Sequence, residues 1–327
     1  MMKRKEGRMA KIDRFLKGVK RAAIAAHVNP DGDAVGSVMG CYRYLRDNYP
    51  DIMADPYLQR PDEKFFYLKD LKDSRDTLDP EAEYDLLILL DISSRDRIGV
   101  AEPLVDKAAN TLCIDHHKTN KGDYTWLFNY PDMSSTSEAL YYFLDPDKIS
   151  ESCAEALYMG IVHDTGIFQY SCTSPETMRT AAGLMEKGIP FSDIVDVTFC
   201  QKTYVQNQIM GRAIMESILL CDGQIIVGAM PGKIMNFYGV TSKDMDGIVS
   251  QLRNTEGVEV AIFLYETQPS VWKVSLRSKE KVDVSRAAVA FGGGGHARAA
   301  GATMTGSFYD VVNNLTKIIA PELGYPA

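Results

Sequence analysis

Short, continuous apolar runs that end in polar residues characterise the first half of the chain. Residues 21–26, 84–90 and 111–114 predict buried strands, because strands covered on both faces are apolar throughout rather than at every second position. Alternation of such strands with helices is typical of an α/β domain with a doubly wound parallel sheet. Helical spacing between these strands and after them falls at residues 35–45, 138–143 and 153–161.

The second half opens with a mostly helical stretch and then returns to a mixture of strands and helices. Residues 174–211 have helical spacing, with a Gly-Ile-Pro break at 188–190. We therefore divide the chain into a first domain at 1–190, a helical linker at 191–213 and a smaller α/β domain at 214–327. In this smaller domain we expect strands at residues 223–229, 258–265 and 271–277, and helices at 242–253, 284–290 and 309–319.

Histidine and aspartate gather where the predicted strands end. The motif HVNPDGD occupies residues 27–33 after the first strand, Asp91 follows the second, and Asp-His-His at 115–117 follows the third. A His-Asp pair at 163–164 follows a predicted helix. Ligands of open α/β sheets bind beyond the carboxyl ends of the strands, and imidazole with carboxylate groups binds divalent metals. The pattern predicts a metal-dependent enzyme.

Each of these motifs also has a purely structural interpretation. The Asp-Gly-Asp sequence at 31–33 could be a surface turn, and Asp91 could cap a helix. Asp164 could mark a helix terminus, and the histidine pair at 116–117 could be structural. Coincidence explains any one motif but poorly explains four together, so metal binding is the favoured interpretation.

Composition narrows the class of protein and of substrate. A chain of 327 residues can bury two cores, and 45% hydrophobic with 24% charged residues is typical of a soluble globular protein. The net charge of −8 argues against a large nucleic-acid surface but leaves room for a small anionic substrate. The six cysteines form no CxxC pair, which predicts reduced thiols. The basic start lacks an apolar signal-peptide region and no run of ~18 apolar residues follows, so we expect a cytoplasmic protein without membrane contact.

A glycine run near the end of the chain suggests a second binding element. Its backbone N–H groups can approach an anion closely because glycine has no side chain, although a flexible linker is the alternative. Two arginines flank the run, and their planar guanidinium groups suit bidentate phosphate recognition. The candidate substrate contacts are Arg277, Gly293, Gly294, Gly295, His296 and Arg298.

With these motifs in this order, the chain resembles the DHH phosphoesterases. The glycine run with His296 is similar to the C-terminal DHH-associated domain of the first type, so the resemblance covers nearly the whole chain. Its length most resembles the nanoRNase and pAp-phosphatase branch of that family. The residues that carry the resemblance are His27, Asp31, Asp33, Asp91, Asp115, His116, His117 and Asp164.

The resemblance implies two manganese ions in the first domain, bridged by Asp91. One ion would be held by His27, Asp31 and Asp91, and the other by Asp33, Asp91, His116 and Asp164. Histidine and carboxylate together suit manganese better than magnesium, whereas ligand type does not exclude iron, cobalt or zinc.

The same resemblance implies roles for the remaining candidate residues. Asp115 would orient a histidine by a hydrogen bond, and His117 would face the scissile phosphate as a catalytic partner. Arg277 and His296 would contact substrate from the second domain, with Arg298 a weaker candidate. His163 has no role in this assignment.

The implied reaction is hydrolysis of short oligoribonucleotides to mononucleotides and of pAp to AMP. Long nucleic acid would not be a partner, because affinity for long strands grows with the number of phosphates neutralised. The resemblance also implies a homodimer. Alternatives are a phosphodiesterase of cyclic di-AMP or pApA and, from another class, a non-catalytic nucleotide sensor; a long-strand exonuclease and a pyrophosphatase fit less well.

Overall fold

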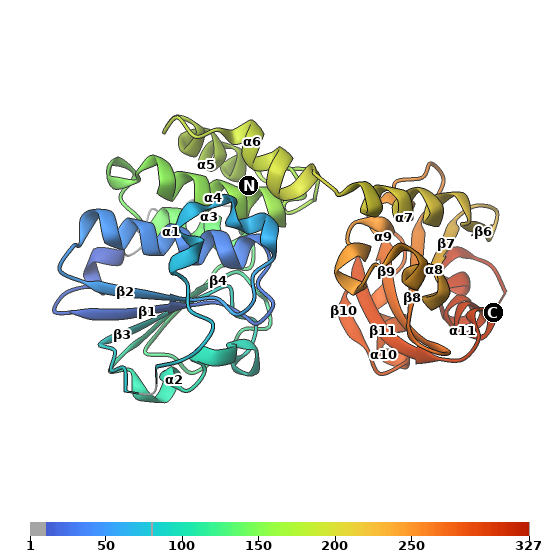
Figure 1. Cartoon of the computed structure of the whole chain (residues 1–327), viewed down its shortest axis with the longest axis horizontal. Helices are drawn as coiled ribbons and strands as arrows, with labels where there is room; N and C mark the ends of the chain where they lie inside the picture. Colours follow the sequence, from blue (N-terminus) through green and yellow to red (C-terminus); the bar gives the residue numbers. More distant parts are fainter. Residues whose placement is uncertain (1–10, 80, 327) are drawn as a thin grey trace. The chain divides into compact units, whose positions relative to one another are not determined.

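The computed structural model describes residues 11–79 and 81–326, and the chain divides into two compact units, Met1–Gln201 and Lys202–Ala327 (Figure 1). The absence of a signal peptide was predicted from residues 1–15, of which residues 1–10 lie outside the described residues. The division falls inside the segment expected to be a helical linker. Helix α6 and a π-helical turn end the first unit, and α7 begins the second. Their bounds are Phe191–Val195, Asp196–Cys200 and Tyr204–Met215.

The first unit is built on a parallel five-stranded sheet with the order β2-β1-β3-β4-β5. Every residue of β3 and β4 is buried, because helical segments cover both faces of the sheet. The predicted α/β fold is thereby confirmed. The strands are β1 (Arg21–Ala25), β2 (Met53–Tyr57), β3 (Leu86–Leu90), β4 (Thr111–Asp115) and β5 (Trp126–Asn129).

Most helices of this unit lie together on one face of the sheet, with the short α2 on the other (Figure 1). Helices α1 and α4 pack tightly against each other because Gly36 of α1 has no side chain, and Gly160 of α4 leaves room for Ser137 of α3. A Cβ on Gly36 would lie 2.5 Å from the Ala156 carbonyl oxygen, and one on Gly160 would collide with Ser137. The helices are α1 (Gly32–Asn48), α2 (Leu104–Lys107), α3 (Thr136–Phe143), α4 (Glu151–Asp164) and α5 (Pro175–Met185).

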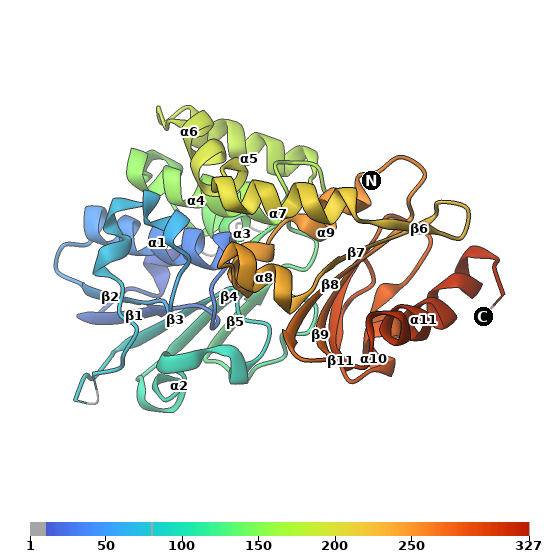
Figure 2. The ribbon, with the colours of Figure 1, turned by 45° about the vertical axis from the view of Figure 1, so that its right-hand side comes forward.

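The second unit contains a mixed six-stranded sheet with the order β10-β11-β9-β8-β7-β6, in which only β7 and β8 pair in parallel. Apolar residues of α10 and α11 cover one face, and those of α7 and α9 cover the part of the other face formed by β7 and β8 (Figure 2). The strands are β6 (Ile218–Leu220), β7 (Ile225–Met230), β8 (Val260–Gln268), β9 (Val271–Ser278), β10 (Gly294–His296) and β11 (Ala299–Thr305). The helices are α8 (Gly232–Tyr238), α9 (Ile248–Arg253), α10 (Val284–Ala290) and α11 (Phe308–Ile319).

The prediction of a single helix at 242–253 is wrong, because the structure has two separate elements there. A 3-10 turn covers Ser242–Met245, and α9 starts only after Gly247, whose φ of +84° is left-handed and cannot continue a helix. Across the described parts of both units, no helix has the length and apolar character needed to traverse a bilayer.

Candidate metal centre

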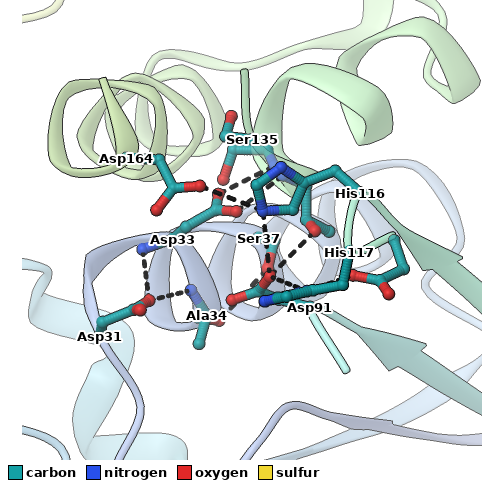
Figure 3. Close-up of polar contacts among 12 residues, drawn as sticks. Asp31, Asp33, Ala34, Ser37, Asp91, His116, His117, Ser135 and Asp164 are labelled. Atoms are coloured by element: carbon teal, nitrogen blue, oxygen red, sulfur yellow. Dashed lines mark hydrogen bonds and ion pairs between the residues drawn. The ribbon is translucent and has the colours of Figure 1, made fainter. Parts of the chain in front are cut away.

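Three neighbouring strands deliver acidic and imidazole side chains to the carboxyl edge of the first sheet. His27 lies just beyond β1, Asp91 directly follows β3, and Asp115 is the last residue of β4. Two helices add Asp33 from the first turn of α1 and Asp164 from the last residue of α4. The side chains of Asp33, Asp91 and Asp164 converge above this edge (Figure 3). Strand ends and helix ends that meet at one edge of the sheet therefore bring together residues that are more than 130 positions apart in sequence.

One group of possible metal ligands consists of His27, Asp31 and Asp91. The His27 Nε2 atom lies 3.7 Å from an Asp31 carboxylate oxygen and 3.4 Å from one of Asp91. Its other ring nitrogen, Nδ1, lies 2.8 Å from the Val28 carbonyl oxygen, to which it can donate. That hydrogen bond would leave the Nε2 lone pair directed at the two carboxylates, as a metal ligand requires.

A second group consists of Asp33, His116 and Asp164. The His116 Nε2 atom lies 3.1 Å from an Asp164 oxygen and 3.6 Å from Asp91 Oδ1. Asp91 therefore reaches both groups, through Oδ2 toward His27 and through Oδ1 toward His116. A third, overlapping combination joins Asp91 to His116 and His117. One shared carboxylate between two ligand groups is the arrangement that a pair of neighbouring cations needs.

The backbone at Asp91 adopts a left-handed conformation with φ of +58°. This conformation is uncommon for a residue other than glycine, although aspartate tolerates it better than most. It occurs at the first residue after the buried strand β3, where the chain turns at the edge of the sheet. Backbone strain is thus stored at the residue that connects the two ligand groups.

A segment that the sequence interpretation missed, Ser-Ser-Thr-Ser-Glu at residues 134–138, fixes two of these carboxylates. The backbone N–H groups of Thr136 and Ser137 donate to Asp33 over 2.6 and 2.9 Å. The Thr136 hydroxyl donates to Asp91 Oδ1 over 3.1 Å. A sequence signal existed, because Ser followed three residues later by Glu often starts a helix, and Ser135 does cap the Glu138 N–H. The two backbone donors at this helix start then hold an acidic side chain.

Asp115 contacts His117 and belongs to none of the three ligand groups. One oxygen of this fully buried carboxylate accepts from His117 Nδ1 over 2.9 Å, and the other accepts from Asn120 over 2.9 Å. Because Nδ1 carries the hydrogen of that bond, the Nε2 atom of His117 is available to exchange a proton with a substrate. The His117 side chain is 25% exposed, so a substrate can reach it.

The clustered negative charges of the site favour the binding of a cation. Burial and the nearby charges of Asp91 and Asp164 raise the pKa of Asp33 well above its usual value. Burial lowers the pKa of His27, but its hydrogen bonds with Asp31 and Asp91 outweigh burial and raise the pKa to about 10. Buried carboxylates this close repel one another unless a positive charge lies among them. Their oxygens and the two imidazoles form a donor set that suits a divalent metal.

His163 lies beside Asp164 on α4, and its ring packs in an aromatic cluster. The ring contacts Phe65 and Phe199 with centroid distances of 5.2 Å each, and its Nε2 lies 3.1 Å from the Thr198 hydroxyl. A side chain on Gly32 would collide with this ring. The only residue that fits between Asp31 and Asp33 is therefore one without a Cβ.

The candidate substrate contacts of the second unit occupy neighbouring strands. Arg277 on β9 pairs with Ala299 on β11, and Ala299 pairs with His296 on β10. Arg298, in the turn between β10 and β11, donates through Nη1 to the Val282 carbonyl oxygen over 2.8 Å, which gives it a structural contact.

The glycine run has its own packing requirement. A Cβ on Gly293 would collide with the Gly301 carbonyl oxygen, and one on Gly295 would lie 2.5 Å from the Ala299 carbonyl oxygen. A Cβ on Gly294 would meet open space. Close approach to β11 therefore explains Gly293 and Gly295, and leaves Gly294 as the glycine that packing does not require.

Comparison with known proteins follows the same division of the chain. The DHH family N-terminal domain matches residues 21–161, and the DHHA1 domain matches residues 222–321. A bifunctional oligoribonuclease and PAP phosphatase NrnA of Thermus thermophilus is 31% identical over 293 residues, which cover 86% of this chain and 84% of the relative. The protein of the same description from Bacillus subtilis is 28% identical, covering 85% and 87%.

A solved structure gives the same fold over both units. The crystal structure of an exopolyphosphatase-related protein from Bacteroides fragilis has a TM-score of 0.86 and 25% sequence identity. It covers 95% of this chain and 97% of its own length.

Proposed function

Because this chain belongs to the DHH family of phosphoesterases, we propose that it hydrolyses short oligoribonucleotides, dinucleotides included, to mononucleotides and converts pAp to AMP. The observation that carries the proposal is the pair of ligand groups that share Asp91 at the edge of the first sheet. The similarity of both units to an oligoribonuclease and PAP phosphatase supports the choice of substrate.

Two manganese ions are the proposed cofactors. His27, Asp31 and Asp91 would hold one ion, and Asp33, Asp91, His116 and Asp164 would hold the other. When bound, the metals supply a nucleophilic water at neutral pH and withdraw charge from the phosphoryl group. Thr136 and the backbone at Ser137 keep the carboxylates of Asp91 and Asp33 in place for this purpose.

His117 is the proposed proton donor to the leaving oxygen. Burial lowers its pKa, but the hydrogen bond with Asp115 and the charge of Asp91 outweigh burial, so the pKa is raised. The protonated ring can therefore release a proton from Nε2 while Asp115 holds Nδ1. Asn120, which donates to the second oxygen of Asp115, fixes the orientation of the pair.

The second unit is proposed to hold the substrate. Arg277 and His296 lie in register across the methyl group of Ala299, so both can contact one phosphate-bearing ligand. Gly294, where an added Cβ would meet open space, is the proposed position at which a ligand approaches the backbone of the glycine run.

A hydrolysis panel with manganese tests the proposal. We expect rapid turnover of dinucleotides and pAp, slower turnover of pentanucleotides, and little turnover of long RNA, cyclic di-AMP or pyrophosphate. Asp91→Asn should remove turnover of every substrate, because it removes the charge shared by both ligand groups. Rapid attack on long single strands without attack on dinucleotides would contradict the proposed substrate.

A further inference from the structure

One face of the sheet in the second unit changes from covered to open between β8 and β9. Ala261 and Phe263 on β8 are buried against α7 and α9. Their partners across the pair of strands, Arg277 and Ser275, are only half-buried. Residues directly opposite each other in a sheet point to the same face. The face that the helices cover over β8 therefore continues, uncovered, over β9.

A hollow of about 280 Å³ occupies this transition. One wall is the segment from the 3-10 turn to α9, which contributes Met245, Val249 and Ser250, and the other is formed by side chains of β8 and β9. Tyr265 is half-buried and supplies aromatic surface, and its ring centroid lies 6.3 Å from that of the buried Phe263. The volume lies just below the usual range for small-molecule sites, so it suits one small ring system.

Three hydroxyl groups of the hollow have no hydrogen-bond partner in the described part of the chain. Among residues 11–79 and 81–326, no hydrogen bond is made by the hydroxyl groups of Ser250, Tyr265 and Ser275. Hydroxyl groups that line a concave surface without a protein partner are available to a ligand. They donate and accept, as the edge of a nucleobase does.

The charge of the hollow is positive although the chain carries −8 overall. Arg277 and Lys243 line it, and its one carboxylate, Asp246, lies 3.3 Å from the Lys202 ammonium group. An aromatic and hydroxylic hollow with cations at its rim is complementary to a planar, hydrogen-bonding ring that carries a phosphate.

We infer that this hollow is a binding site for the base of one nucleotide, with Arg277 and Lys243 at its phosphate. The inference rests on the proposed function and deepens it, because it assigns the part of the second unit that recognises a nucleoside rather than a phosphate alone. Tyr265 and the serines at 250 and 275 determine which base is accepted, and the size of the hollow limits recognition to a single base.

Calorimetric titration of the full-length protein in EDTA tests this site without the reaction. The probes are 5′-AMP, 5′-GMP, 5′-CMP, 5′-UMP, ribose 5-phosphate and inorganic phosphate. We expect at least one nucleotide to bind tenfold or more tightly than ribose 5-phosphate. Equal binding of ribose 5-phosphate and all four nucleotides would overturn the inference, since the base would then add nothing.

Variants locate the site. Ser275→Leu fills the hollow and Tyr265→Leu removes a ring and a hydroxyl group, so each should weaken nucleotide binding about tenfold or more. Thr305→Leu, at an exposed position of β11 outside the hollow, is the matched control and should leave binding unchanged. A loss that follows Tyr265→Leu with an unchanged melting temperature supports the site even if Ser275→Leu fails to fold. Unchanged binding in folded Tyr265→Leu overturns it.

Failure of this binding site and failure of the proposed function give different results. Dinucleotide hydrolysis by a protein that binds no nucleotide in EDTA would overturn this inference and leave the phosphoesterase proposal intact. Nucleotide binding that responds to the variants, in a protein that hydrolyses none of the proposed substrates, would support the site and contradict the proposed reaction.

Discussion

The hydroxyl group of Thr136 donates a hydrogen bond to Asp91 Oδ1 over 3.1 Å, at the first turn of α3. The same residue donates its backbone N–H to Asp33 over 2.6 Å. One threonine thus holds a carboxylate from each of the two ligand groups.

Thr136→Val should therefore weaken manganese binding, because it removes the hydroxyl group and retains the shape and the backbone donor. Loss of a hydrogen bond to a metal-ligating carboxylate typically costs about 10- to 100-fold in metal affinity or activity. Manganese affinity, measured by calorimetry, should fall within this range. Thr136→Ser retains the hydroxyl group and should restore most of it. Equal affinity in the valine and serine variants would show that the contact does not position Asp91.

A different result is expected at His117, where the effect should fall on turnover rather than on metal affinity. His117→Asn removes the proposed proton donor, and general acid catalysis typically contributes about 10²- to 10⁴-fold. We expect kcat to fall by this factor while the manganese affinity changes less than about threefold. Asp115→Asn should lower kcat by a smaller factor, since it weakens the contact to His117 Nδ1 and leaves the ring in place. A large loss of manganese affinity in His117→Asn would instead place His117 among the ligands, in the overlapping group with Asp91 and His116.

The pKa of His27 predicts how the stability of the metal-free protein changes with pH. Its pKa is raised to about 10, against about 6.5 for an unfolded chain. A raised pKa means that the folded state binds the proton more tightly, so the stabilisation is complete below about pH 6.5 and is lost as the pH rises through about 10. The melting temperature in EDTA should therefore fall between these values. His27→Asn should reduce the decline without removing it, because at His116 hydrogen bonding with Asp164 likewise outweighs burial and raises the pKa to about 10. His296→Asn, on the exposed strand β10, should leave the decline unchanged.

The sequence predicted the strands that deliver the ligands better than the helices that complete the site. The runs at 21–26, 84–90 and 111–114 correspond to β1, β3 and β4, because a strand buried on both faces is apolar at every position. The edge strands β2 and β5 were missed. The first contains Asp55 and Pro56, and the second is half-buried throughout, so neither has a continuous apolar core signal.

Helix ends were harder to predict because polar residues set them. The first helix was expected from residue 35, but α1 begins at Gly32, since the Asp31 carboxylate accepts from the N–H groups of Asp33 and Ala34 over 3.1 Å each. Asp31 is therefore both a helix cap and a possible ligand, whereas the sequence suggested a surface turn as the alternative to a ligand at this motif. The role of Thr136 depends on a contact with Asp33 across 103 residues, and no local pattern carries that information.

The glycine run permits a separation of packing from substrate binding. Gly293→Ala would place a Cβ against the backbone of β11, so we expect a melting temperature lower by several degrees, given ~1–3 kcal/mol for overpacking. Gly294→Ala meets open space and should leave the melting temperature unchanged. If the substrate approaches the backbone at Gly294, the added methyl group obstructs that approach, and KM for pAp should rise with kcat nearly unchanged. An unchanged KM in Gly294→Ala, together with a destabilised Gly293→Ala, would contradict a substrate contact at Gly294. The glycine run would then serve only the packing of β10 against β11.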